Sequence, residues 1–167
     1  MKENNNLINL LTGIYTDVLK EIDKLFESKK DIDTITKAIF TKYYYNLAKK
    51  TIQTYIELWD DIIKNDSNTK NNWKVIRKDW RVILTPYCEI KYKRRYYKNK
   101  KSGEYCYLID KYLGIDKYQR ISPMLEKNII NLSQNLSARK VAYEIAKNNP
   151  ELILTRQTIK NKIKKNS

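Results

Sequence analysis

The stretch from Ile90 to Leu108 reads IKYKRRYYKNKKSGEYCYL, and its alternation decides the fold of the middle of the chain. In its first half, apolar or aromatic residues alternate with basic ones, which is the period of a β-strand. The turn Lys101–Gly103 then leads into a further short strand, Tyr105–Leu108. An earlier run with the same alternation ends at Leu84. We therefore expect a three-stranded antiparallel meander with one basic face and one β-branched or aromatic face.

Two long amphipathic helices are predicted before this sheet. Apolar residues recur at helical spacing from Leu7 to Leu25 and again from Ile35 to Ile63. The first helix is expected to end near Ser28, and Asp31 or Asp33 is expected to cap the second. The polar run over residues 65–72 is expected to be a linker or loop.

These two helices have two open interpretations. They carry no net charge, so they are expected to form a helical hairpin over residues 1–65 that packs on itself. They could equally provide the seam of a homo-oligomer, because short apolar stripes do not specify which partner covers them. The meander and its linker would occupy residues 66–119.

Three further helices are predicted over residues 120–167. Ser122 is expected to cap a helix that has Pro123 at its first position, and Ser137 to cap a second one. Thr155 would cap the third, whose inner face holds Ile159 and Ile163. This order is typical of a helix-turn-helix unit. A plain three-helix bundle with a basic terminal helix is the alternative. The expected class is α+β.

The net charge of +15 is confined to two segments. Residues 73–101 hold eleven Lys or Arg against Asp79 and Glu89, and residues 138–167 hold eight against Glu144 and Glu151. The rest of the chain is neutral. Clustered cations release counterions on binding a polyanion, so the pattern favours nucleic acid over two merely solvated faces.

Several kinds of chemistry are excluded or disfavoured by composition. The chain has no histidine, which excludes Ser-His-Asp and Cys-His catalysis and a Cys/His zinc site. Cys88 and Cys106 are expected to be small core residues. No Gly-rich phosphate loop and no membrane-length apolar run occurs. We therefore expect a cytoplasmic, nucleoid-associated protein without a metal or cofactor.

The middle of the chain resembles bacterial insertion-sequence transposases of the ISLre type, which are often described as uncharacterised transposase-like proteins. The matching elements are Arg94–Tyr97, Gly103–Tyr105, Tyr107–Asp110, Leu113–Gly114 and Ile121–Pro123. The later stretches Leu136–Ala146 and Thr155–Ile159 resemble the helix-turn-helix of that family. Cys88 departs from the glycine that the family usually has at the turn between the first two strands.

This resemblance implies the end-recognition half of a transposase, which holds the terminal inverted repeats of a mobile element. Such transposases continue into a catalytic domain with Asp/Asp/Glu metal ligands, whereas this sequence stops at Ser167. We therefore expect a module that binds double-stranded DNA and has no catalysis of its own, with roles in DNA recombination and transposition.

The candidate DNA contacts lie on the predicted strand and on the last two helices. Strand cations would follow the phosphate backbone, and Arg, Gln and Asn near the start of the last helix would reach base edges. The candidates are Lys91, Lys93, Arg94, Arg95, Arg139, Arg156, Gln157, Lys160, Asn161 and Lys164.

Two other functions stay open. The neutral N-terminal helices would suit an interaction protein, such as a truncated remnant that pairs with a full-length transposase. The Tyr-rich sheet would suit an RNA- or single-strand-binding protein, because unstacked bases need aromatic platforms.

Overall fold

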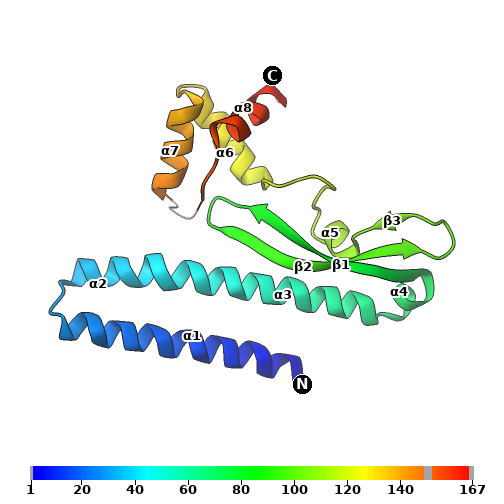
Figure 1. The fold of residues 1–167 in the computed structure, drawn as a ribbon, viewed down its shortest axis with the longest axis horizontal. Helices are drawn as coiled ribbons and strands as arrows, with labels where there is room; N and C mark the ends of the chain where they lie inside the picture. The colour runs from blue at the N-terminus through cyan, green and yellow to red at the C-terminus, as the bar shows by residue number, and fades with distance from the viewer. Residues whose placement is uncertain (1, 149–151, 166–167) are drawn as a thin grey trace. The chain divides into compact units, whose positions relative to one another are not determined.

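The computed structural model of the chain describes residues 2–148 and 152–165. Over these residues it contains eight α-helices and a three-stranded antiparallel sheet in the order β1-β2-β3, which confirms the predicted α+β class (Figure 1). The chain divides into two compact units, Met1–Ile62 and Ile63–Ser167. The sheet and the C-terminal helices thus belong to one unit. None of the described helices is long and apolar enough to cross a membrane.

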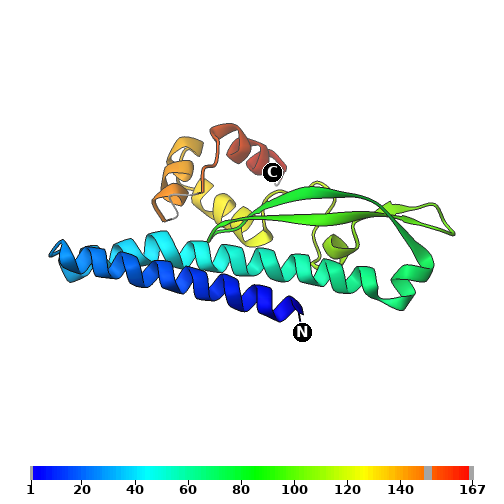
Figure 2. The same ribbon diagram turned by 60° about the horizontal axis from the view of Figure 1, so that its bottom comes forward.

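The first unit consists of long helices. Helix α1 (Lys2–Glu27) and the helices α2 (Ile32–Ile39) and α3 (Tyr45–Asn65) lie side by side in both Figure 1 and Figure 2. Five residues of π-helix, Phe40–Tyr44, join α2 to α3. The predicted cap is confirmed, because Asp31 Oδ1 accepts a 2.9 Å hydrogen bond from the backbone N–H of Thr34.

The expected loop over residues 65–72 is partly wrong, because helix α4 (Ser67–Asn72) lies within it. Asp66 caps this helix by accepting a 2.9 Å hydrogen bond from the backbone N–H of Thr69. The helix has no buried residue. A helix without an apolar face has no hydrophobic period, so the pattern of the sequence did not indicate it.

Strand β1 (Trp73–Leu84) pairs with β2 (Glu89–Asn99) along its whole length. Trp80 stands opposite Lys93, and Arg81 opposite Tyr92. A bulge between Val75 and Arg77 shifts the register near the start of β1. Because β1 is the first strand in the sheet order, its other side is an edge.

Strand β3 is shorter than predicted. It covers only Tyr105–Cys106, and the residues that follow form helix α5 (Leu108–Tyr112). Ile109 and Asp110 of this helix are buried. A short apolar run does not by itself distinguish a strand from a buried helical turn, which is why the prediction failed here. Gly114, with a φ of 64°, follows the end of the helix, in a conformation that glycine adopts without strain.

The C-terminal helices are α6 (Pro123–Ser133), α7 (Ala138–Asn148) and α8 (Arg156–Lys165). The caps predicted at Ser122 and Thr155 are confirmed, since their hydroxyls accept hydrogen bonds of 3.3 and 3.1 Å from backbone N–H groups. The three helices share one core. Its buried residues are Ile121, Leu125, Ile129, Val141, Ile145, Leu152, Leu154 and Ile159.

The segment 115–121 connects the sheet to these helices. Ile121 forms a parallel bridge with Leu84 at the end of β1. The buried guanidinium of Arg81 donates to the backbone carbonyls of Asp116 at 2.9 Å and Lys117 at 3.1 Å, and also to that of Gln119. These bonds fix the segment against the edge of β1.

Candidate nucleic-acid interface

The exposed cations of β2 lie around a tryptophan. Lys91 and Lys93 are exposed, and the Nζ atom of each lies 4.9 Å from the ring centroid of Trp80. The alternation of a strand places these three side chains on one face of the sheet. This face, with its two ammonium groups against an indole that is 52% exposed, is the basic ribbon face.

Arg94 does not lie on an exposed basic face, contrary to the sequence-based expectation. It is buried and forms an ion pair with Asp110 of α5. Its guanidinium also lies 3.5 Å from the centroid of the Tyr107 ring. Tyr92 donates its hydroxyl to Asp110 at 3.1 Å. Arg94 therefore joins α5 to the sheet and is not available to a phosphate.

Arg95 is also buried, with 7% of its surface exposed. Alternation places it on the same face as Lys93, yet only the lysine is exposed. The period of the sequence indicates which residues share a face, but burial along a face depends on what covers each part of it. Of the four strand candidates, only Lys91 and Lys93 therefore stay in the interface.

A hydrogen-bonded network continues from Tyr107 to Asp79. The Tyr107 hydroxyl donates to Asp79 Oδ2 at 2.6 Å, and Arg77 Nε donates to the same oxygen at 2.8 Å. The hydrogen bond from Tyr107, together with that from Arg77, lowers the pKa of Asp79. Burial and the hydrogen bond to Asp79 raise the pKa of Tyr107. The network joins the middle of β1 to Tyr107, which lies between β3 and α5.

The predicted polar face of α8 is exposed. Arg156, Gln157, Lys160, Asn161 and Lys164 are all exposed. Ile159 on the opposite side is fully buried, and Ile163 packs against the core. Arg139 is exposed in the first turn of α7.

Two of these side chains are already ordered by each other. Gln157 Nε2 donates a 2.8 Å hydrogen bond to Asn161 Oδ1, one helical turn further along α8. This bond leaves the Oε1 of Gln157 and the Nδ2 of Asn161, an acceptor and a donor, for another partner. An acceptor and a donor side by side are what the edge of an adenine requires.

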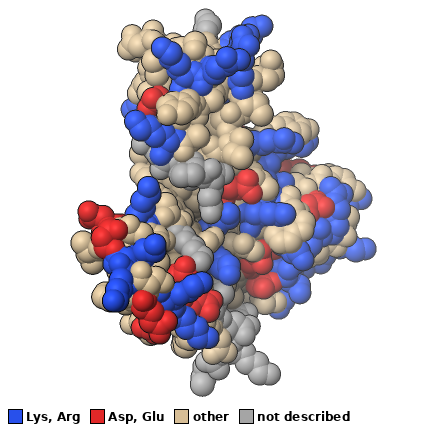
Figure 3. Space-filling model, turned by 60° about the vertical axis from the view of Figure 1, so that its left-hand side comes forward, with Lys and Arg blue, Asp and Glu red and all other residues tan. Residues whose placement is uncertain are grey.

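The space-filling view supports the division of charge. In Figure 3 blue Lys and Arg atoms predominate over the C-terminal helices, whereas red and blue atoms are mixed over the N-terminal helices. The structure thus presents the basic residues of the C-terminal segment on its surface.

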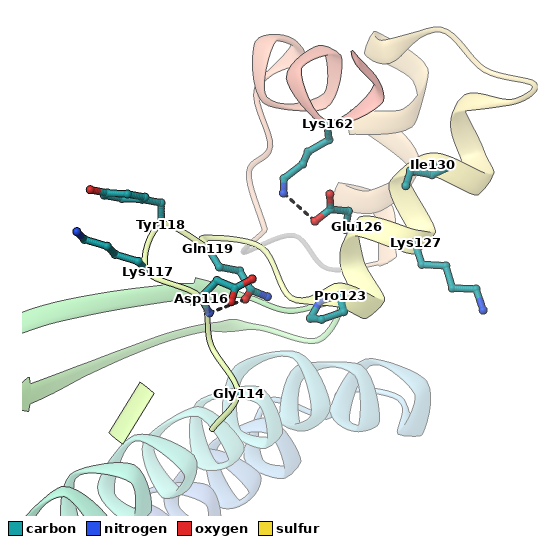
Figure 4. A pocket seen from close by; sticks show the side chains of 10 residues that line it. All are labelled: Gly114, Asp116, Lys117, Tyr118, Gln119, Pro123, Glu126, Lys127, Ile130 and Lys162. Atoms are coloured by element: carbon teal, nitrogen blue, oxygen red, sulfur yellow. Dashed lines mark hydrogen bonds and ion pairs between the residues drawn. The ribbon is translucent and has the colours of Figure 1, made fainter. Parts of the chain in front are cut away.

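A hollow between the segment 115–121 and helices α6 and α8 is a less suitable site (Figure 4). Its volume is about 830 Å³. Two of the charges at its wall compensate each other, because Lys162 Nζ forms a 2.7 Å ion pair with Glu126. Within the described residues, no three His, Cys, Asp or Glu side chains gather as metal ligands. Cys88 and Cys106 are both buried free thiols, and burial raises the pKa of Cys106.

Two features of this surface were missed at the sequence level. Arg81 reads as one more strand cation, although it is the side chain that fixes the segment 115–121. Tyr118, in that segment, is 82% exposed. Nothing in the local sequence indicates these two features. The position of the segment 115–121 depends on hydrogen bonds from Arg81, which lies more than thirty residues away in the sequence.

Comparison with known proteins gives a family without a described activity. A family model described as an uncharacterised protein family, UPF0236, matches residues 15–167. A UPF0236 protein of Caldanaerobacter subterraneus subsp. tengcongensis is 32% identical over 160 residues, which cover 95% of this chain and 32% of the relative. Another from the same organism is 38% identical over 122 residues, which cover 71% of this chain and 25% of the relative.

The chain therefore spans about a third or less of the length of these relatives. The name of the first relative joins eleven locus designations of that organism, and the name of a third joins four. No solved structure matches the chain.

Proposed function

Since the chain belongs to the uncharacterised protein family UPF0236, we propose that its second unit is the DNA-binding module of a longer, transposase-like protein. In this proposal the module holds double-stranded DNA at the ends of a mobile element. It performs no chemistry itself. The observation that carries the proposal is the exposed polar face of α8 beside an otherwise fully packed three-helix core.

Helix α8 is suited to enter a major groove. Its capped first turn presents Arg156 and Gln157, and Asn161 follows on the same face. In helix-turn-helix proteins, the first turns of the second helix meet the base edges. Guanine is recognised by Arg and adenine by Gln or Asn, so this face can distinguish sequences. Lys160, Lys164 and Arg139 would contact phosphates on either side.

The basic ribbon face is suited to a sequence-independent role. Lys91 and Lys93 present ammonium groups without a planar fork, which favours phosphate contact over base reading. Arg94 and Arg95 are buried and take no part in this role. The ribbon would therefore add affinity and salt dependence, but not specificity.

The repeated loci of the relatives support a mobile element. A protein named for eleven loci of one organism is what an element that copies itself within a genome would leave. The greater length of the relatives leaves room for a catalytic domain beyond the matched segment.

Selection of duplexes from a random pool tests the proposal. The full chain, immobilised at physiological salt, should enrich a defined sequence over successive rounds, because α8 presents base-reading side chains. Enrichment without any shared sequence would contradict sequence-specific recognition. Failure to retain any duplex would contradict DNA binding altogether.

A second candidate is self-association through the first unit. Helix α1 exposes an apolar row at helical spacing, which includes Ile8, Tyr15, Leu19 and Phe26 at 57%, 65%, 44% and 62% exposure. Such a row favours a partner helix. Light scattering should then show a dimer that the double variant Tyr15→Lys/Leu19→Lys converts to a monomer; a wild-type monomer would contradict this.

A further inference from the structure

We propose that a hollow beside the edge of β1 binds one unpaired nucleotide of a DNA strand. The hollow has a volume of about 730 Å³, which is within the range of small-ligand sites. Trp80 and Arg81 both line it, although consecutive strand residues point to opposite faces of a sheet. The hollow therefore lies at the open edge of the sheet, where Tyr118 and Arg120 of the segment 115–121 complete its wall.

Exposed aromatic residues from two segments line this hollow. Trp80 is 52% exposed, and Tyr118 is 82% exposed. A single exposed ring needs no explanation, but two rings from distant parts of the chain at one hollow match a planar ligand. Every nucleobase has a π-face that stacks on such rings, whatever its sequence.

The charge of the hollow matches a phosphate. Its wall holds Arg77, Arg81, Arg94, Lys117 and Arg120, and Glu89 as the acid. Arg77 and Arg94 are paired with carboxylates. Within the described part of the chain, Lys117 and Arg120 form no ion pair, so their charges are available to an anion. A place for a base beside a place for a phosphate fits a nucleotide, in which a sugar joins the two.

The segment that carries Tyr118 is already held in place. Arg81 binds the carbonyls of Asp116, Lys117 and Gln119, on both sides of the tyrosine. Gln119 accepts a 3.0 Å hydrogen bond from the Asp116 N–H and donates one of 3.1 Å to the Ile121 carbonyl. A fixed platform loses little conformational entropy on binding, which favours a weak ligand such as one nucleotide.

That this nucleotide belongs to a bound DNA duplex rests on the proposed function. Ile153, in the segment just before α8, also lines the hollow. The hollow thus reaches the segment that leads into the helix proposed to read the duplex. A duplex that carries an unpaired nucleotide at its end can contact α8 with its paired part and place the unpaired nucleotide in the hollow.

The test compares three forms of one duplex by fluorescence anisotropy with the full chain. The first is a blunt duplex, and the second is the same duplex with a two-nucleotide single-stranded extension. The third is the same duplex with an extension of equal length whose two nucleotides lack their bases. The intact extension should tighten binding about 5-fold or more, the lower limit for one stacked base. The abasic extension should add much less.

Variants assign the effect to this hollow. Tyr118→Ala and Trp80→Ala should each abolish the gain from the extension, whereas Tyr118→Phe should keep the gain because the ring remains. Tyr118→Ala should also leave blunt-duplex affinity within about 2-fold. Tyr112→Ala, also at an exposed tyrosine but outside the hollow, is the matched control and should keep the gain. Far-ultraviolet circular dichroism checks that each variant is folded. If Trp80→Ala does not fold, the Tyr118 variants alone decide the test, because the highly exposed Tyr118 can be replaced without disturbing the core.

The outcomes separate this inference from the proposed function. If the blunt duplex binds but the extension adds nothing, the nucleotide site is contradicted and the duplex module stands. If no duplex binds, both are contradicted. A ribonucleotide extension that binds more tightly than the deoxyribonucleotide one would overturn the assignment to DNA.

Discussion

The Arg94 guanidinium and the Asp110 carboxylate form an ion pair in which the two side chains are only 7% and 6% exposed. The pair joins β2 to the short helix α5, and Tyr92 adds its hydroxyl to the same carboxylate. An arginine from the most basic stretch of the chain is thus a structural residue. This relationship separates the strand cations that hold the fold from those available to a ligand.

Removing one partner of this pair should destabilise the fold more than replacing both. Asp110→Ala leaves a buried guanidinium without its carboxylate, so the free energy of unfolding should fall by about 3–5 kcal/mol. The double variant Arg94→Met/Asp110→Val should recover most of this loss, because apolar side chains of comparable volume need no counter-charge. Urea titration measures both. A double variant no more stable than Asp110→Ala would contradict the pairing.

Acid should weaken the fold through Asp79. Its pKa is lowered by hydrogen bonds from Tyr107 and Arg77, so it contributes stability above its unfolded pKa of about 4. That contribution is lost as the pH falls through the lower folded pKa. The free energy of unfolding should therefore fall more steeply below about pH 4 in the wild type than in Asp79→Asn. Urea titrations give the free energy of unfolding at each pH. If this free energy falls in parallel with pH in the wild type and in Asp79→Asn, Asp79 does not contribute to the loss of stability in acid.

The salt dependence of DNA binding should come from the exposed cations and not from the buried Arg94 and Arg95. If about six phosphates are neutralised, a plot of the logarithm of the binding constant against the logarithm of the salt concentration should have a slope of about −5. Lys91→Ala/Lys93→Ala should remove about two phosphate contacts and so lower the magnitude of this slope by about 2. The sequence preference should stay the same. Lys20→Ala/Lys24→Ala on α1, also at exposed lysines, is the matched control and should leave the slope unchanged. A wild-type slope near zero would contradict a phosphate-binding role for the ribbon.

The core of the C-terminal helices should depend on Ile159. This side chain is fully buried, so Ile159→Ala should cost about 2–5 kcal/mol of the free energy of unfolding and lower the melting temperature. Lys160→Ala, at the adjacent exposed position, should change stability by less than about 0.5 kcal/mol. Equal melting temperatures for the two variants would place Ile159 outside the core.

Local signals of the sequence predicted the helix starts well. Ser122 followed by Pro123, and Thr155 before the last apolar stripe, mark caps that the structure confirms by hydrogen bonds. These features depend on a few adjacent residues, which is why they can be read without the fold. The buried face of α8, with Ile159 at its centre, follows from helical period alone.

Features that depend on distant contacts were not predictable in this way. Their basic side chains made Arg94 and Arg95 candidates together with the exposed lysines, because the sequence does not show that α5 brings Asp110 to Arg94. Helix α5 itself was not predicted, and its first residue, Leu108, was assigned to the third strand. The role of Arg81 likewise requires the segment 115–121 to return to the edge of β1.

The central claim, that α8 reads base edges, is tested most directly by the specificity ratio in a competition binding assay. The ratio compares the duplex enriched by selection with a scrambled duplex, for the wild type, Gln157→Ala and Asn161→Ala. The matched controls are Gln134→Ala and Asn131→Ala, at exposed positions near the end of α6. We predict that each α8 variant lowers the ratio about 5-fold or more while non-specific affinity survives, and that the controls do not. Unchanged ratios for both α8 variants would contradict the claim and leave α8 as a structural helix.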